Sequence, residues 1–264
     1  MIKLLGFPFD ANSSFLRGPA LAPPLIRQMQ TNGSANEYSE HGTRVVIGEN
    51  VKDVGDLTLI HSDPKKIYEQ IKEAVAQELT SDDKMIFLGG DHSVSYPLIE
   101  SYSKVFPGLH VLHIDAHADL YDDFDTNPYS HASPFARVME KGLVKSLTQV
   151  GIRTLNPHQR EQAQRFGVEI VEMRNFSYNF IKNLKGPLYL SVDLDGLDPA
   201  FAPGVSHHEP GGLTVRELLT IIQNISVPLV GADIVEYNPT RDVNHMTAMV
   251  GYKVLKEIAS KMLS

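Results

Sequence analysis

Short apolar segments alternate with longer amphipathic segments along the whole chain of 264 residues. Seven runs are too short and too uniformly apolar for amphipathic helices, so we interpret them as buried strands: 3–8, 85–88, 110–114, 149–152, 169–172, 187–193 and 229–234. Segments with helical spacing lie between or after them: 64–79, 96–106, 133–141, 159–166, 215–225 and 246–262. This order predicts an α/β fold in which helices cover both faces of a mainly parallel sheet.

The chain contains no internal repeat, low-complexity tract or obvious linker. Two stretches rich in glycine, proline or small polar residues, 18–24 and 32–35, are predicted to be loops within the fold. Because α/β chains of this length often form a single unit, we expect one domain over residues 1–264.

Composition restricts the classes of function. The formal net charge of −8 argues against binding nucleic acid or anionic lipid through a basic surface. The absence of cysteine excludes disulfides and thiolate metal sites. No apolar stretch is long enough for a membrane span, and the N-terminus does not resemble a signal peptide. These features predict a cytoplasmic protein that acts on a small molecule and binds neither nucleic acid nor membrane.

Side chains suited to metal binding follow three of the predicted strands. After residues 111–114, three such side chains stand at every second position: Asp115, His117 and Asp119. Asp193 and Asp195 repeat this spacing after 188–192, and Gly89-Gly90-Asp91-His92 follows a third strand. In extended structure, alternate side chains share one side. Ligands of α/β sheets bind beyond the carboxyl ends of strands, so these side chains are expected to meet in one site.

Each segment alone could be explained by turn and helix-capping residues. A buried group of four or more aspartates is different, because the carboxylates repel one another and lose hydration unless a cation neutralises them. Four carboxylates and two imidazoles without sulfur favour an ion harder than Zn²⁺, and so many anionic ligands favour two ions with shared carboxylates. We expect two Mn²⁺, with Ni²⁺, Co²⁺ and Fe²⁺ as alternatives.

The motifs resemble those of the ureohydrolase family, which includes arginases and agmatinases. The resemblance spans nearly the whole chain and rests on 6–10, 17–27, 89–93, 115–119, 191–199 and 231–236. It implies a three-layer α/β/α sandwich that assembles as a homotrimer or homohexamer. It further implies that one metal is held by His92, Asp115, Asp119 and Asp193, and the other by Asp115, His117, Asp193 and Asp195.

Within the family, the likeness is closest to plant-type arginases. Local features carry it: Tyr129-Ser130-His131-Ala132-Ser133, Gly151-Ile152-Arg153 and the long loop 198–213. His208 departs from the plant-type pattern, which usually has an apolar residue at that place in a loop expected to face the substrate.

The resemblance implies a hydrolase that cleaves a guanidino group and releases urea. Two metal ions would lower the pKa of a shared water, so that hydroxide exists near neutral pH. Glu236 would pair with the guanidinium, and His131 would carry a proton to the leaving amine. Asp119 is predicted to take part in catalysis as well as in metal binding.

L-Arginine is the expected substrate, and agmatine or another guanidino compound is the alternative. The α-carboxylate and α-amine of arginine would be bound by Ser133, Asn156 and Glu209. Two other classes remain: a non-catalytic scaffold, which the intact set of ligands disfavours, and a metal-dependent amidase or deacetylase, whose sites typically hold one Zn²⁺ with fewer carboxylates.

Overall fold

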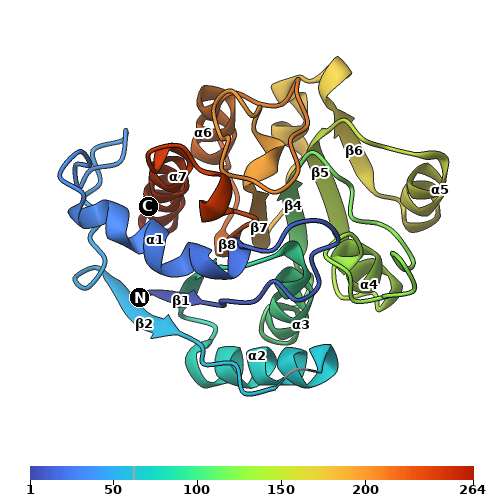
Figure 1. Ribbon diagram of the computed structural model, residues 1–264, viewed down its shortest axis with the longest axis horizontal. Helices are drawn as coiled ribbons and strands as arrows, with labels where there is room; N and C mark the ends of the chain where they lie inside the picture. The colour runs from blue at the N-terminus through green and yellow to red at the C-terminus, as the bar shows by residue number, and fades with distance from the viewer. Residues whose placement is uncertain (62) are drawn as a thin grey trace.

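A computed structural model describes residues 1–61 and 63–264, and one parallel sheet runs through its centre (Figure 1). The strands found in these residues are β1 (Ile2–Gly6), β2 (Val51–Asp56), β3 (Lys84–Leu88), β4 (His110–Ile114), β5 (Ser146–Ile152), β6 (Glu169–Glu172), β7 (Leu188–Asp193) and β8 (Leu229–Val235). Their order across the sheet is β2-β1-β3-β8-β7-β4-β5-β6, and all neighbours pair in parallel.

Helices cover both faces of this sheet (Figure 1). The α-helices are α1 (Ala22–Gln28), α2 (Pro64–Glu78), α3 (Ser95–Val105), α4 (Pro134–Glu140), α5 (Pro157–Phe166), α6 (Val215–Gln223) and α7 (Met246–Leu263). Short 3₁₀ helices occur at Pro19–Leu21, Met29–Thr31, His92–Val94, Met173–Asn175, Tyr178–Asn183, Leu194–Gly196 and Pro239–Arg241. None of the helices in the described residues has the length and apolar content needed to cross a bilayer.

Alternation along the strands divides the core into two layers. Ile86 and Leu88 of β3 pack with residues of α1, α6 and α7. Met85 and Phe87 of the same strand pack with residues of α2, α3 and α4 on the other face. Successive side chains of a strand point to opposite faces, so apolar runs of this kind suit a sheet covered on both sides. The predicted three-layer α/β/α fold is confirmed.

Two elements differ from the sequence prediction. Strand β2 was not predicted, because it lies at the sheet edge and carries exposed charges such as Lys52 and Asp53. The predicted loop at 18–24 is wrong in its second half, where α1 begins at Ala22. Pro23 and Pro24 fit the first turn of this helix, since the N–H groups that proline lacks have no partner there anyway.

The order of the strands places the candidate site. Strands β3, β8, β7 and β4 are consecutive neighbours at the middle of the sheet. Their carboxyl ends therefore lie side by side at the same end of the strands. The segments that follow them are nevertheless separated by up to about half of the sequence. Each of these four strand ends continues directly into residues that the sequence singled out.

Candidate metal centre

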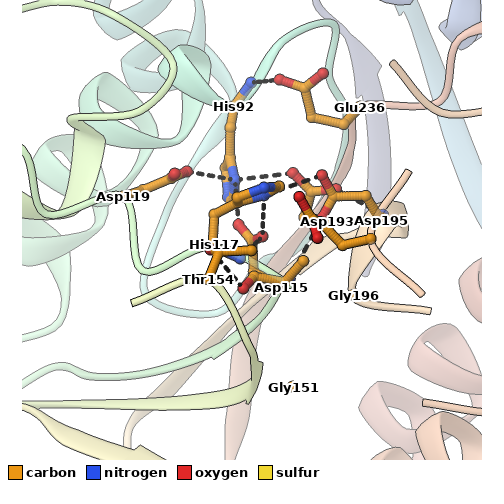
Figure 2. A network of polar contacts seen from close by, with 12 residues as sticks. His92, Asp115, His117, Asp119, Gly151, Thr154, Asp193, Asp195, Gly196 and Glu236 are labelled. Carbon is orange, nitrogen blue, oxygen red and sulfur yellow. Dashed lines mark hydrogen bonds and ion pairs between the residues drawn. The ribbon is translucent and has the colours of Figure 1, made fainter. Parts of the chain in front are cut away.

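The six predicted ligands come together beyond the carboxyl ends of the central strands (Figure 2). His92 begins the 3₁₀ turn after β3, and Asp193 ends β7. Asp115, His117 and Asp119 follow β4, and Asp195 lies in the 3₁₀ turn after β7. All six are buried except His117, whose side chain is 26% exposed.

Three carboxylates converge on one atom of His92. Its Nδ1 lies 3.1 Å from Oδ2 of Asp115, 3.1 Å from Oδ2 of Asp119 and 3.2 Å from Oδ2 of Asp193. A second group forms around His117, whose Nδ1 lies 3.3 Å from Oδ1 of Asp115 and 3.2 Å from Oδ2 of Asp195. Asp115 thus presents one oxygen to each group, as a carboxylate shared by two ions would.

A buried hydrogen-bond chain fixes the orientation of His92. Its Nε2 lies 2.9 Å from Oγ of Ser191, which donates to Oδ1 of Asp233 at 2.6 Å. A hydroxyl has one hydrogen, and Ser191 uses it to donate to Asp233. Ser191 must therefore accept from Nε2–H of His92. Nδ1 then presents its lone pair to the three carboxylates, and none of the described residues forms a hydrogen bond with it. A proton or a metal ion must lie between these atoms, and the donor set suits a divalent cation.

The pKa values show how strongly these charges interact when only protons are available. Burial lowers the pKa of His92, but the carboxylates of Asp115, Asp119 and Asp193 around Nδ1 outweigh it and hold that pKa well above its usual value. Burial, followed by Asp195 and Asp115, raises the pKa of Asp193 well above its usual range. Burial and Asp115 raise the pKa of Asp119 to about 6. Divalent cations would relieve this repulsion and keep the carboxylates ionised.

His113 belongs to the same cluster but supports it from behind. It is fully buried, and Gln149 donates from Nε2 to its Nδ1 at 2.9 Å. Its other nitrogen, Nε2, therefore carries the hydrogen and donates to Oδ2 of Asp115 at 2.8 Å. Although its position allows metal contact, this tautomer offers no lone pair, so His113 orients Asp115.

A cavity of about 200 Å³ opens over the cluster. Its lining includes four of the predicted ligands and the outer-wall residues Ser14, Tyr121, Phe124, His131, Ala132, Thr154, Gln159, His207, Glu209 and Glu236. A larger hollow of about 840 Å³ lies at the opposite end of the sheet, beside His110, Ser146 and Leu188, where β4, β5 and β7 begin. None of the predicted site residues lines it, so the cavity over the cluster is the candidate active site.

His131 and Glu236 form a buried pair at this cavity. Nδ1 of His131 lies 2.7 Å from Oε1 of Glu236, which also accepts from the backbone N–H of His92 at 2.9 Å. The other oxygen, Oε2, is buried without a partner in the described residues. Glu236 has a φ of 63°, a left-handed conformation that is unusual for glutamate and typical of functional sites.

The opposite charges of His131 and Glu236 stabilise each other. Burial lowers the pKa of His131, but the charge of Glu236 outweighs it and raises the pKa to about 9. Burial raises the pKa of Glu236, but the charge of His131 outweighs burial and lowers that pKa. An imidazolium beside a carboxylate is therefore the state expected at neutral pH.

Of the other three predicted substrate contacts, one lines the cavity and two do not. Glu209 lines the cavity. Ser133 is fully buried at the start of α4, and Asn156 caps α5 by accepting from the N–H of Gln159 at 2.9 Å; neither lines the cavity. Their roles as substrate contacts stay predictions. His208 is exposed and bonds to the carbonyl of Pro203, outside the lining, which instead includes its neighbour His207.

Several residues of the site could not be recognised in the sequence. Gln159 lines the cavity in the first turn of α5, and its buried Oε1 has no partner in the part of the chain that the structure describes. Ser191 and Asp233 lie inside apolar strands, and Ser14 lies in an ordinary polar loop. Ser191 and Asp233 do stand within the family-like stretches 191–199 and 231–236, and this is the signal that could have pointed to them.

Comparisons with known proteins agree with this geometry. The family model described as "Arginase family" matches residues 1–260. Arginase 1, mitochondrial, of Arabidopsis thaliana is 47% identical and covers 98% of this chain and 80% of that protein. The agmatinase of Bacillus subtilis (strain 168) is 33% identical, with 97% and 89% covered. The solved arginase from Medicago truncatula has a TM-score of 0.92 at 44% identity and covers 99% of this chain and 87% of that chain.

These relatives correct one prediction. Several plant arginases at 44–47% identity carry "mitochondrial" or "chloroplastic/mitochondrial" in their names. Their names point to an organelle, so the prediction of a cytoplasmic protein is wrong. It rested on the absence of a signal peptide and of cysteine, and neither feature distinguishes cytoplasm from the interior of an organelle.

Proposed function

The chain belongs to the arginase family, whose members hydrolyse carbon–nitrogen bonds in linear amidines, and we propose that it converts L-arginine and water to L-ornithine and urea. One observation carries the proposal: Glu236 lines the cavity over the metal-type cluster, and its buried Oε2 has no hydrogen-bond partner in the described residues. This combination can hold a planar cation beside an activated water.

Six side chains would hold two divalent cations, and we propose Mn²⁺ for both. His92, Asp115, Asp119 and Asp193 would hold one ion, and Asp115, His117, Asp193 and Asp195 the other. The convergence on Nδ1 of His92 and on Nδ1 of His117 supports this division. When bound, the ions would supply a water of lowered pKa as the nucleophile.

Glu236 would bind the guanidinium of the substrate. Oε1 is already held by His131 and by the N–H of His92, so Oε2 is the oxygen left to accept from the substrate. A charge-assisted hydrogen bond in a buried site is strong because water competes little there. The fixed Oε1 keeps the carboxylate from turning away, and this orients the guanidinium carbon toward the cluster.

His131 would supply the proton that the leaving amine needs. Its ring is buried at the cavity, and its pKa of about 9 keeps it protonated at neutral pH. An acid with such a pKa is available to most molecules of the enzyme at the moment of cleavage. Asp119, whose Oδ2 lies 3.1 Å from Nδ1 of His92, would take part in catalysis as a ligand of the ion that His92 holds.

The outer part of the cavity supports an amino-acid substrate. Oε1 of Gln159 is an unsatisfied acceptor, and Glu209 adds a carboxylate to the same cavity. Both suit the α-ammonium group of arginine, while Ser133 and Asn156 are kept as candidates for its carboxylate. Agmatine also carries an ammonium group, so agmatinase activity is the second candidate; the higher identity to plant arginases favours arginine.

We also propose that residues 1–264 form one domain and that copies assemble as a homotrimer or homohexamer. A continuous sheet through the chain supports the first statement. The second rests on the family resemblance, and light scattering of the purified protein tests it.

Parallel assays of the Mn²⁺-loaded protein test the function. Urea release would be measured with L-arginine, agmatine, 4-guanidinobutyrate and guanidine at equal concentrations. We expect the largest kcat/KM with L-arginine. A larger value with agmatine would make the chain an agmatinase, and no urea from any of the four would refute the proposed function.

A further inference from the structure

His131 has a second partner besides Glu236. Its Nε2 lies 3.0 Å from the backbone nitrogen of Ser14 and 2.8 Å from the hydroxyl oxygen of the same residue. Ser14 is exposed and lines the mouth of the cavity, whereas His131 is 7% exposed. One residue thus offers Nε2 both a donor that cannot change its role and a hydroxyl that can.

The two groups suit different protonation states of His131. A backbone N–H can only donate, so it stabilises Nε2 as a lone pair, with the hydrogen of the neutral ring on Nδ1 facing Glu236. A hydroxyl oxygen can accept, so it stabilises Nε2–H of the imidazolium. Because Ser14 is exposed, its hydroxyl hydrogen can turn toward solvent when the oxygen accepts.

The loop that carries Ser14 is held firmly against His131. The carbonyl of Asn12 accepts from the N–H of His131 at 3.1 Å, and the N–H of Asn12 donates to buried Asp91 at 2.9 Å. The Asn12 side chain donates to Tyr68 and Ser93 at 3.0 and 3.1 Å. A Cβ at Gly90 would lie 1.8 Å from the carbonyl oxygen of Phe9, so only glycine permits this approach of the loop.

We propose that Ser14 is a positioning residue for His131, with its backbone N–H holding the neutral imidazole and its hydroxyl holding the protonated one. The role of His131 as the acid rests on the proposed function; its contact with Ser14 does not. During turnover, one proton leaves the imidazolium for the leaving amine and the ring becomes neutral. Ser14 keeps Nε2 hydrogen-bonded before and after this transfer, and it gains and loses no atom itself.

Other charged and titratable groups face His131 and also affect its pKa. They are Glu236 after β8, Asp91 after β3, Asp119 after β4 and His207 in the loop before α6, whose ring centroid lies 5.5 Å away. The carboxylates favour the imidazolium, and none of them contacts Nε2 among the described hydrogen bonds. The Ser14 hydroxyl can therefore be removed without changing the number of charges around the ring.

The test measures the pKa of His131 directly in the Mn²⁺-loaded protein. Deuterium exchange at Cε1 of the ring, followed by peptide mass spectrometry across pH, reports this pKa without need for activity. Ser14→Ala keeps the N–H and removes the hydroxyl, so the pKa is expected to fall by about one unit, the size of one hydrogen bond to a charged group. Ser14→Thr should restore it, and Ser13→Ala, at the neighbouring position, should leave it unchanged.

The pH profile of kcat gives the second measurement. With L-arginine, the limb on which activity is lost at high pH should move downward in Ser14→Ala by the same amount as the pKa. An unchanged His131 pKa in Ser14→Ala, or an equal fall in Ser13→Ala, would overturn the inference. If the expected pKa changes occur in a protein that releases no urea, the proposed function fails and the pairing of Ser14 with His131 stands.

Discussion

Nε2 of His92 lies 2.9 Å from the hydroxyl oxygen of Ser191, and this contact aims the opposite nitrogen at three aspartates. Ser191 is fully buried and donates its one hydrogen to Asp233, which Tyr189 also contacts at 2.8 Å. The chain of bonds determines which nitrogen of His92 is free to bind a metal. Outer hydrogen bonds of this kind commonly set the affinity of a metal site.

Ser191→Ala should therefore weaken metal binding without unfolding the protein. We expect about a 10- to 100-fold loss of Mn²⁺ affinity at one of the two sites, because His92 loses the partner that fixes its tautomer. Competition with a chelator of known affinity measures this. Ser101→Ala is the matched control, since among the described residues its hydroxyl bonds only to the carbonyl of Pro97 in its own helix. Equal affinities in the two variants would show that Ser191 does not orient His92.

Glu236→Gln should separate substrate binding from metal binding. The metal content should stay at the wild-type level, since Glu236 is not one of the six proposed ligands. KM for L-arginine should rise by about tenfold or more, because a neutral amide replaces the carboxylate opposite the guanidinium. Metal analysis by mass spectrometry and steady-state kinetics on one preparation measure both. Loss of metal in this variant would instead make Glu236 a ligand.

The activity should fall at high pH with the deprotonation of His131. The acid form is the one required, and its pKa is raised to about 9, so activity is present below that pH and is lost as pH rises through it. His131→Asn should lower kcat by about 100-fold or more at neutral pH and remove this limb of the profile. A variant that keeps both the rate and the limb would assign the acid to another group.

Gln159→Ala should impair substrates that carry an ammonium group. Gln159 lines the cavity and its Oε1 has no partner in the described residues, so KM for L-arginine should rise by about tenfold. The KM for 4-guanidinobutyrate, which lacks the ammonium, should be unaffected. Gln162→Ala on the same helix is the control, since Gln162 bonds to Asp122 and Arg165 and does not line the cavity. An equal effect on both substrates would place the ammonium elsewhere.

The sequence was most informative where strands end. All seven predicted strands are present, and the carboxyl ends of β3, β4, β7 and β8 carry the residues predicted for the site. A uniformly apolar run followed by aspartate or histidine is a local pattern, and a parallel sheet brings such ends together without further information. The meeting of these side chains in one cluster could therefore be predicted from the sequence, and their role as metal ligands stays a prediction.

The remaining parts depend on contacts between distant segments. Ser14 and His131 are 117 positions apart, and nothing around Ser14 distinguishes it from another loop serine. The residue types of Ser133 and Asn156 suit a substrate, but Asn156 caps α5, Ser133 is fully buried before α4, and neither lines the cavity. Strand β2 was missed because exposed charges at a sheet edge hide its pairing with β1. Such placements follow from packing, which local spacing does not encode.

The proposed chemistry requires two metal ions bound among these six side chains. Anomalous scattering from crystals grown with Mn²⁺, recorded on both sides of the manganese absorption edge, tests it most directly. We expect two manganese peaks per chain, one beside Nδ1 of His92 and one beside Nδ1 of His117. Asp193→Ala should lose both peaks, because that carboxylate is proposed to serve both ions. A single peak, or none among these side chains at saturating Mn²⁺, would contradict this proposal.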